Sequence, residues 1–427
     1  MARMMNDSGQ DKLSPPVVDD SDPSSLSMAA ARQRIGENLP TITEHESIDT
    51  RTATMRILAT AIDSPVNLPS FRASAMDGYA IRHADRCDRL VVVDQSLAGH
   101  PGPHRMAAGT CQRITTGARV PDDADTVVQQ ENIVRKGEFL TVSVLPEYGL
   151  HVRAMGSDCS RGERLLAAGA QLGASERALL AAHGMHRVDV LRPLRVALFS
   201  TGDELVEPGD TLAEGQIYDA NRPLLDSLLA TPSTIIDDLG ICPDSPAALS
   251  ATLGRASNAD VVVSSGGVSV GDADHVREAI EAAGDIALWK IAMKPGRPMT
   301  FGKIGNDQVY FGLPGNPVSA AVTALMFVRP ALARMLGHLP ADLPPLSAVC
   351  ESTLVKRPSR VEYQRGVLSR GSDGVIKVTT TGIQDSHVLR SLQQANCFIE
   401  LPFESSGVTF GDTVAVFPFT HFSAPLL

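Results

Sequence analysis

The spacing of hydrophobic positions changes several times along the chain, and each change predicts a different kind of structure. Between residues 191 and 339, apolar runs of strand length alternate with amphipathic segments of helical period. These runs are RVALFST, NRPLLDSLLA, STIIDDLGI, SPAALSATLGRA, DVVVSSGG and DHVREAIEAAG. Such alternation is typical of a parallel sheet with helices on its faces, so we predict a doubly wound α/β domain here.

The segments around this block follow other patterns. Residues 64–154 contain short Val-rich runs broken by Gly and Pro, which predict a β-rich insertion, and strand-like runs over 340–427 predict a C-terminal β-barrel. Residues 25–63 and 155–190 mix helical and strand-like patterns, and we expect them to pair across the insertion as one small discontinuous domain. Within the first of these segments, the strand-like start of ITEHESIDTRTATMRILAT is expected to lead into a helix. Residues 1–24, rich in Asp, Ser and Pro, predict a disordered tail, and the whole is a multidomain α/β plus β protein.

Length and composition narrow the class of protein. A chain of 427 residues exceeds what one hydrophobic core usually serves, so we expect several domains. The net charge of −11 argues against a nucleic-acid-binding surface, which needs concentrated Lys and Arg. The six cysteines are scattered singly, without the spacing of a zinc site. We find no apolar run of membrane-spanning length and no secretory leader, so we expect a cytoplasmic protein without a membrane partner.

Small and acidic residues follow three strands of the predicted sheet. The first strand leads into Thr201-Gly202-Asp203-Glu204, and another leads into Ser265-Gly266-Gly267 with Ser269 close behind. A third strand ends in Pro314-Gly315-Asn316, where Asn316 is a candidate N-cap and the next residue is Pro. Because ligands of such sheets collect beyond the carboxyl ends of the strands, we expect these loops to meet around an anionic ligand.

Charged residues near these loops suggest a phosphate site with a divalent cation. Lys290 and Lys294 are candidate counter-charges for phosphate, while Asp203, Glu204 and Asp274 could hold a hard cation such as Mg²⁺. Taken alone, each of these features is typical of an ordinary turn or a solvated side chain. Because they are all predicted at one edge of one sheet, they favour magnesium-assisted cleavage of a phosphoanhydride.

Several motifs together resemble the molybdopterin molybdenumtransferase family, to which the enzyme-like domain of gephyrin is related. They occur in the family's order over roughly residues 26 to 420. The matching strings are SAMDGYA from Ser74, ITTGA from Ile114, STGDEL from Ser200, SSGGVSVG from Ser264, KPG from Lys294 and GLPGNP from Gly312.

The resemblance implies an activity and assigns residues to it. The family inserts molybdate into adenylylated molybdopterin and releases AMP with Mg²⁺, in an elongated homodimer of four-domain subunits. By motif, Asp203, Glu204, Asp244, Asp274, Lys290 and Lys294 would be the functional residues of the α/β domain. Asp77, Thr116 and Asp158 would reach the substrate from the insertion of the dimer mate. A transient contact with the molybdopterin adenylyltransferase that supplies the substrate is also implied.

The C-terminal domain would take part in holding molybdate. Arg360 and Ser386 match positions linked to molybdate in the family, and Lys294 and Arg297 add positive charge suited to a tetrahedral dianion. The chain departs from the family pattern at Ser157, where an acidic residue is common, and at Asp385, where a small residue is common.

Two other functions compete with catalysis. The chain could bind the pterin or its nucleotide without reaction, or it could be a gephyrin-like scaffold that binds other proteins. A binding module would need only the α/β block, and a scaffold would need neither the carboxylates nor the lysines. The presence of all of them favours the enzyme.

Overall fold

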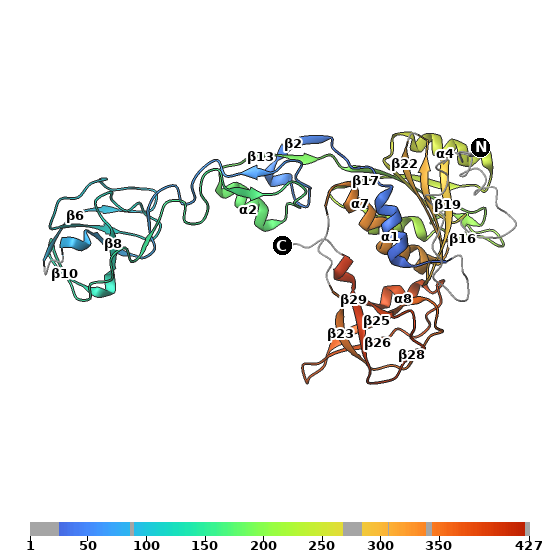
Figure 1. Cartoon of the computed structure of the whole chain (residues 1–427). Coiled ribbons are helices and arrows are strands. Elements are labelled where there is room, and N and C mark those ends of the chain that lie inside the picture. Colours follow the sequence, from blue (N-terminus) through green and yellow to red (C-terminus); the bar gives the residue numbers. More distant parts are fainter. Residues whose placement is uncertain (1–24, 86–88, 268–283, 306, 339–343, 423–427) are drawn as a thin grey trace, which may run out of the picture.

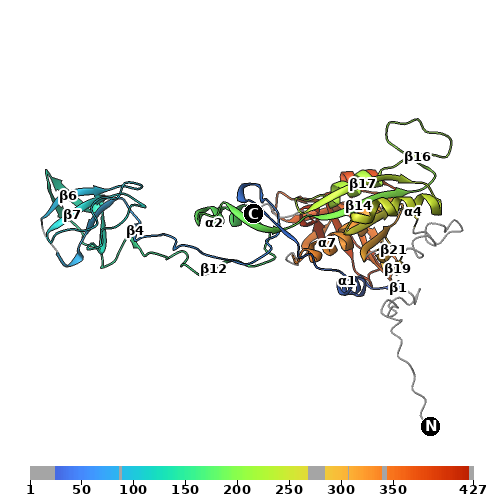
Figure 2. The ribbon, with the colours of Figure 1, turned by 90° about the horizontal axis from the view of Figure 1, so that it is seen from above.

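The chain folds into an elongated molecule with the β-rich insertion at one end (Figure 1). The structure, a computed structural model, describes residues 25–85, 89–267, 284–305, 307–338 and 344–422. The α/β domain and the C-terminal barrel lie at the other end, and the small mixed domain connects the two ends (Figures 1 and 2). The expected α/β plus β fold with several domains is confirmed.

The α/β domain is built on a seven-stranded sheet in the order β1-β19-β21-β22-β18-β14-β17. Its strands are β1 (Ser25–Leu26), β14 (Leu194–Thr201), β17 (Thr234–Cys242), β18 (Val261–Ser265), β19 (Gly284–Ile291), β21 (Pro298–Ile304) and β22 (Gln308–Leu313). The predicted all-parallel sheet is wrong at one strand, because β21 runs antiparallel to both β19 and β22. The chain reverses through Pro295 and Gly296, and the other neighbouring pairs are parallel.

Alternate residues of the central strands point into two different cores, as a sheet covered on both faces requires. In β14, Leu194, Val196 and Leu198 pack into the larger core, whereas Ala197 and Phe199 pack into the smaller one. The larger core contains residues of α1 (Met28–Glu37), α3 (Asn221–Leu229), α6 (Pro317–Thr323) and α7 (Arg329–Met335). The smaller core contains residues of α4 (Pro246–Arg255).

One helix in the described part of the chain has the length and composition of a membrane span. It runs from Pro317 to Met335 through α6, the π-helical turn η5 (Ala324–Val328) and α7, and 78% of its most apolar window is buried within the structure. Val318, Val322 and Phe327 lie in the larger core. This helix therefore packs as a core helix of the α/β domain.

The first described residues belong with the α/β sheet, whereas we expected them in the discontinuous domain. Ser25 and Leu26 of β1 pair with Lys290 and Ile291 of β19, and Ala31 and Ile35 of α1 pack into the larger core. This pairing is between residues far apart in the sequence, so local pattern could not reveal it.

The mixed domain and the insertion follow each other along the molecule. In the mixed domain, β2 (His45–Asp49) pairs with β13 (Arg187–Leu191), β3 (Ile62–Asp63) pairs with β12 (Arg164–Leu166), and α2 (Ala174–Ala182) packs beside them. The insertion is a six-stranded sheet of β5 (Gly78–Ile81), β6 (Leu90–Ser96), β7 (Thr110–Ile114), β8 (Thr126–Gln129), β9 (Ile133–Lys136) and β10 (Phe139–Val142). The short pair of β4 (Ala73–Ser74) and β11 (Val152–Arg153) lies beside it.

The helix predicted after the strand-like residues near position 48 is wrong. Only a short 3-10 turn, η1 (Thr50–Thr52), forms there, and Met55 has a positive φ of 59°. The amide of Leu58 donates to the carbonyl of Ala170, and the carbonyl of Ile57 accepts from Leu191. These long-range bonds outcompete the local helical tendency of the segment.

The C-terminal domain is a closed barrel in the order β25-β26-β23-β29-β27, with β27 pairing back to β25. Its strands are β23 (Leu346–Cys350), β25 (Val361–Arg370), β26 (Ile376–Thr380), β27 (Cys397–Leu401) and β29 (Thr413–Pro418). A short helix, α8 (Leu389–Gln394), interrupts the strands, although the sequence led us to expect no helix there. The two-residue strand β20 (Met293–Lys294) pairs with β25, so the segment after β19 joins the barrel to the α/β domain.

Candidate functional site

The three loops that follow β14, β18 and β22 touch one another. The amide of Gly266 donates to the carbonyl of Leu313 at 3.1 Å, and a Cβ atom at Gly266 would lie 2.4 Å from the carbonyl oxygen of Thr201. Gly266 also has a φ of 93°, which disfavours residues other than glycine. A Cβ atom at Gly315 would be 3.8 Å from the Cα atom of Gly266. The structure therefore brings together Gly266, Gly315 and the residues beside them, as the sequence predicted.

The carboxylates after β14 and β17 also lie together. Asp203 accepts a hydrogen bond from the backbone amide of Asp244 at 3.0 Å through one carboxylate oxygen, and the hydroxyl of Thr201 donates to the Asp244 carboxylate. The carboxylate of Glu204 folds back over Gly202, whose Cβ position would lie 2.6 Å from Glu204 Oε2. Asp203 and Glu204 are exposed, so both can meet a ligand from solution.

Two predicted residues of this site, Ser269 and Asp274, lie outside the described residues. Over the ranges that the structure describes, no group of three or more His, Cys, Asp or Glu side chains is arranged to hold a metal ion. The expected cation site of Asp203, Glu204 and Asp274 therefore remains a prediction.

The cationic segment lies at the same edge of the sheet but farther along it. The β19 strand runs in the same direction as β14, so Lys290 lies at the carboxyl edge. Four strand spacings separate β19 from β14, which places Lys290 roughly 19 Å from the Asp203 loop. Only an extended ligand could contact both ends of this edge.

The residues after Lys290 lead into the barrel. Lys294 on β20 donates to Glu362 of β25 at 3.0 Å, and the Lys294 side chain is half exposed while Glu362 is buried. Arg297 donates to the hydroxyl of Ser25 at 3.2 Å. The amide of Val361, directly after Arg360, donates to the carbonyl of Ala292 at 2.9 Å. The backbone of Arg360 therefore lies beside this cationic segment.

The loop that carries Ser386 docks on the α/β domain. The carbonyl of Ser386 accepts from the amide of Val318, in the first turn of α6, at 3.1 Å. Asn316 occupies the N-cap position and Pro317 the first helical position, as predicted, but the Asn316 side chain makes no capping bond. The first turn of α6 thus holds the barrel loop through Val318, a role that the sequence did not suggest.

A buried arginine on the outer face of the barrel, beneath α8, holds the same loop. Arg365 is 1% exposed and donates to Ser391 Oγ at 3.0 Å and to the carbonyl of Asp385 at 3.1 Å. Burial lowers the pKa of Arg365 to about 10, while the charges of Glu362 and Asp385 oppose the shift. Asp385, which stands where the family commonly has a small residue, is exposed. The substitution therefore does not place a carboxylate in the protein interior.

Of the three residues expected from the insertion, Asp77 and Thr116 belong to the far end of the molecule, whereas Asp158 lies in the connection to the mixed domain. The amide and hydroxyl of Thr116 donate to Asp77 Oδ1 at 2.7 and 3.0 Å, and these bonds hold the pKa of Asp77 below its usual value. Asp158 is exposed and lies near Leu68, whose carbonyl accepts its amide. Figures 1 and 2 place the insertion far from the α/β sheet, so Asp77 and Thr116 do not join Asp203 within one chain.

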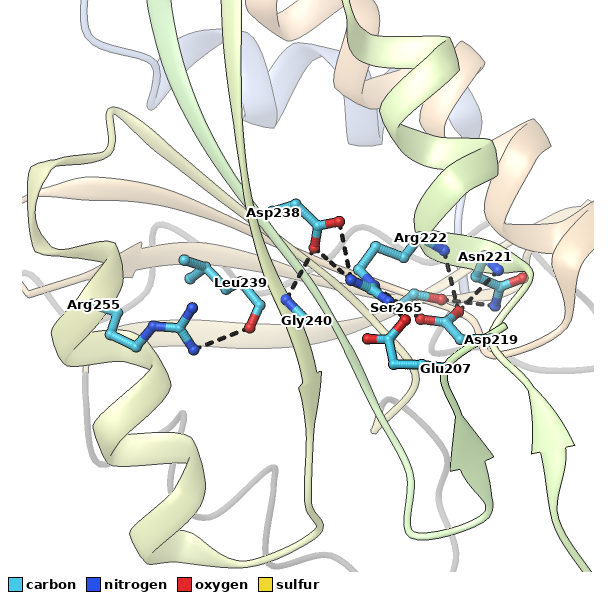
Figure 3. Close-up of polar contacts among 9 residues, drawn as sticks. All are labelled: Glu207, Asp219, Asn221, Arg222, Asp238, Leu239, Gly240, Arg255 and Ser265. Atoms are coloured by element: carbon cyan, nitrogen blue, oxygen red, sulfur yellow. Dashed lines mark hydrogen bonds and ion pairs between the residues drawn. The ribbon is translucent and has the colours of Figure 1, made fainter. Parts of the chain in front are cut away.

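Sequence reasoning missed a polar cluster that supports the loops (Figure 3). Arg222 in the first turn of α3 is buried and pairs with Asp219 at 3.1 Å, with Asp238 at 2.7 Å and with Glu207. Burial alone would lower the pKa of Arg222, but the hydrogen bonds with Asp238, Asp219 and Glu207 outweigh it and raise that pKa. The available signal was Asp219 two residues before a helix start, which is typical of a capping residue.

The same helix start contacts two of the loops. Asn221 donates through Nδ2 to Ser265 Oγ at 2.8 Å and to the carbonyl of Gly315 at 2.6 Å. These contacts could not be predicted, because the three residues lie far apart in the chain.

Comparisons with known proteins agree with this arrangement of domains. Family models match over three consecutive ranges: the MoeA N-terminal region (domain I and II) over residues 26–184, a probable molybdopterin binding domain over 197–334, and the MoeA C-terminal region (domain IV) over 347–419.

Individual relatives match over most of their length. The molybdopterin molybdenumtransferase of Haemophilus influenzae is 41% identical over 401 residues, which are 93% of this chain and 99% of the relative. The enzyme of the same name from a Nostoc species is 37% identical over 87% of this chain and 88% of the relative. A crystal structure of a molybdopterin biosynthesis MoeA protein from Pyrococcus horikoshii superposes with a TM-score of 0.77 at 30% identity, over 92% of this chain and 99% of that one. The chain therefore belongs to the molybdopterin molybdenumtransferase family.

Proposed function

We propose that this chain inserts molybdate into adenylylated molybdopterin and releases AMP, forming the molybdenum cofactor. The observation that carries the proposal is the contact of the loops after β14, β18 and β22 at one edge of the sheet, with Asp203 and Asp244 hydrogen-bonded beside them. The segment from Lys290 to Arg297 leads from this edge to the barrel residues expected to hold molybdate. A pterin joined to a nucleotide is long enough to use such an extended edge.

The loops and lysines would bind the phosphates of the substrate. Backbone amides near Ser265, Gly266 and Gly267 can approach phosphate oxygens closely because glycines carry no side chain. Lys290 and Lys294 would add positive charge at the far end of the edge. The role of Pro314-Gly315-Asn316 would be to complete the loop wall beside Gly266.

Asp203 and Glu204 have the chemistry to hold Mg²⁺. Both are exposed carboxylates, which are the ligands that this hard cation prefers, and Asp274 would be the third ligand. When bound, Mg²⁺ would neutralise charge on the phosphate oxygens during cleavage of the phosphoanhydride. Asp244 would keep Asp203 in place through its backbone amide.

Molybdate would be held where the barrel meets the cationic segment. A tetrahedral dianion needs positive charge and hydroxyl donors, and Arg360, Ser386, Lys294 and Arg297 supply both. The pairing of β20 with β25 and the bond from Val318 to Ser386 keep the barrel against the α/β domain.

We further propose a cytoplasmic homodimer in which the insertion of one subunit completes the site of the other. The basis is the position of the insertion, which carries Asp77 and Thr116, at the end of the molecule opposite the α/β domain (Figure 2). The five described cysteines are free and buried, which suits a reducing compartment. The adenylylated substrate would arrive through a transient contact with molybdopterin adenylyltransferase.

A reconstituted reaction tests the proposal. Purified protein is incubated with adenylylated molybdopterin, molybdate and Mg²⁺, and both AMP and active cofactor are quantified. We expect both products to exceed a control without protein, and EDTA to suppress them. The variant Asp203→Asn should fold and lose most activity, whereas Asp307→Asn should not, because Asp307 is an exposed partner of Lys303 far from the loops.

The alternatives predict different results. A binding module would retain the adenylylated pterin without releasing AMP, and a scaffold would do neither. Either result with the wild-type protein would contradict the proposed enzyme.

A further inference from the structure

Asn221 lies where two of the site's loops meet, although no motif marked it. It is 8% exposed at the start of α3, and its single amide nitrogen bonds to Ser265 Oγ at 2.8 Å (Figure 3). The same nitrogen bonds to the Gly315 carbonyl at 2.6 Å. An amide nitrogen carries two hydrogens, so both are used. Asn221 therefore links the loop after β18 to the loop after β22.

The backbone of Asn221 is itself fixed by the buried ion cluster. Asp219 Oδ1 accepts from the amides of Asn221 and Arg222 at 3.0 and 3.2 Å, and Asp219 Oδ2 accepts from Arg222 Nε at 3.1 Å. The Asp219 side chain is 1% exposed, and Arg222 is also paired with Asp238. Because buried, charge-assisted bonds are short and strong, the start of α3 has little freedom to shift.

We propose that Asn221 is a positioning residue that sets the affinity of the site for the phosphate-bearing end of the pterin nucleotide. It does so by fixing Ser265 and Gly315, so that the backbone amides of the neighbouring glycines face the ligand without prior rearrangement. This inference rests on the proposed function. Both amide hydrogens are committed to the protein, so Asn221 acts through the loops and does not donate to the substrate.

Two substitutions of Asn221 test the two hydrogen bonds that its side-chain amide donates. Asn221→Ala removes both bonds without adding charge. Asn221→Asp keeps the shape of the side chain but places a carboxylate oxygen against the Gly315 carbonyl, while Ser265 can still turn its hydroxyl to donate. If the alanine variant does not fold, the aspartate variant still tests the link to Gly315.

Asn396 provides a matched control. It too joins two segments through its amide, donating to the Leu368 carbonyl at 2.9 Å and accepting from the Leu368 amide, but it lies in the barrel. Asn396→Ala therefore removes the same number of side-chain hydrogen bonds, at an exposed position, without touching the loops. Thermal unfolding of each variant reports any general loss of stability.

The experiment measures the KM values for adenylylated molybdopterin and for molybdate, and the affinity for AMP by calorimetry. In both Asn221 variants we expect the KM for the pterin nucleotide to rise by about tenfold or more, since each lost bond to a buried polar group costs roughly a factor of ten. AMP affinity should fall in parallel, whereas the KM for molybdate should stay unchanged. Asn396→Ala should match the wild type in all three quantities.

The outcomes distinguish this inference from the proposed function. An unchanged KM for the pterin nucleotide, or equal rises in both KM values, would overturn the role of Asn221 while leaving the enzyme intact. If the wild-type protein releases no AMP, the proposed function fails, and the role of Asn221 is then tested by AMP calorimetry alone. That role is overturned if the wild type does not bind AMP, or if the Asn221 variants bind AMP as tightly as the wild type.

Discussion

Gly266 occupies a position that no other residue can take without moving the loop after β14. Its φ is 93°, and an added Cβ atom would lie 2.4 Å from the carbonyl oxygen of Thr201. We expect Gly266→Ala to lower the free energy of unfolding by about 1–3 kcal/mol through backbone strain. Because the strained loop is part of the site, AMP affinity measured by calorimetry should fall as well.

Gly254 gives the matched control for this substitution. It lies in the last turn of α4, and a Cβ atom there would meet nothing within 4 Å. Gly254→Ala should therefore stabilise the protein by about 0.4–1 kcal/mol in urea unfolding, because alanine restricts the unfolded chain more than glycine does. Equal stability changes in the two variants would show that the loop around Gly266 accommodates a side chain without strain.

At the residue scale, site residues that directly follow a strand could be predicted from the sequence, whereas the buried residues that support the site loops could not. Asp203 and Gly266 could be predicted because they stand directly after apolar runs, and a strand's end determines where the next residues lie. The cluster of Glu207, Asp219 and Arg222 could not, because its members meet only after β17 and α3 pack together. A buried arginine is recognisable as buried only when its partners are known.

The loop from Thr380 to Ser391 depends on Arg365. The Arg365 side chain donates to the Asp385 carbonyl and to the Ser391 hydroxyl. The carbonyl of Ser386, the residue after Asp385, accepts a hydrogen bond from α6. Arg365→Met keeps apolar volume beneath α8 but removes the side-chain donor to both acceptors. We expect the KM for molybdate to rise about tenfold, with stability lower by about 1–3 kcal/mol, and the KM for the pterin nucleotide to stay unchanged.

Arg370→Met on the same strand provides the comparison. Arg370 is exposed at the end of β25 and donates to the Gly374 carbonyl in a turn. Its loss should change neither KM. A rise in the KM for the pterin nucleotide in Arg365→Met would mean that the barrel loop serves the nucleotide as well as molybdate.

At the scale of elements, the hydrophobic pattern correctly predicted strands and helices whose own residues determine their structure. The strands β14 and β18 were found as continuous apolar runs of strand length, and α4 was found from its helical spacing. The errors arose where distant pairing decides the outcome. The segment around Leu58 pairs with residues near Ala170 in place of a helix, and β21 runs antiparallel because Gly296 and its neighbours reverse the chain.

At the scale of the whole molecule, composition shifts along the chain predicted the sequence of domains but not how they lie in space. The family match implied that Asp77 and Thr116 reach the substrate of the dimer mate, and Figure 1 places the insertion at the end of the molecule opposite the α/β domain. The distance follows from the strands β3, β12 and their extensions, which connect the insertion to the mixed domain. No local pattern reports such an extended connection.

This separation makes subunit exchange a direct test of the proposed dimer. A dimer should have a solution mass of twice 45.3 kDa, and Asp77→Ala and Asp203→Ala homodimers should each be nearly inactive. If one site needs Asp203 of one subunit and Asp77 of the other, a mixed dimer of the two variants contains one site with both residues intact. Mixing them under exchange conditions should then restore AMP release to about a quarter of the wild-type rate, since roughly half the dimers are mixed and half of their sites are intact. If each site were formed within one chain, every site in the mixture would lack one carboxylate, and mixing would restore nothing.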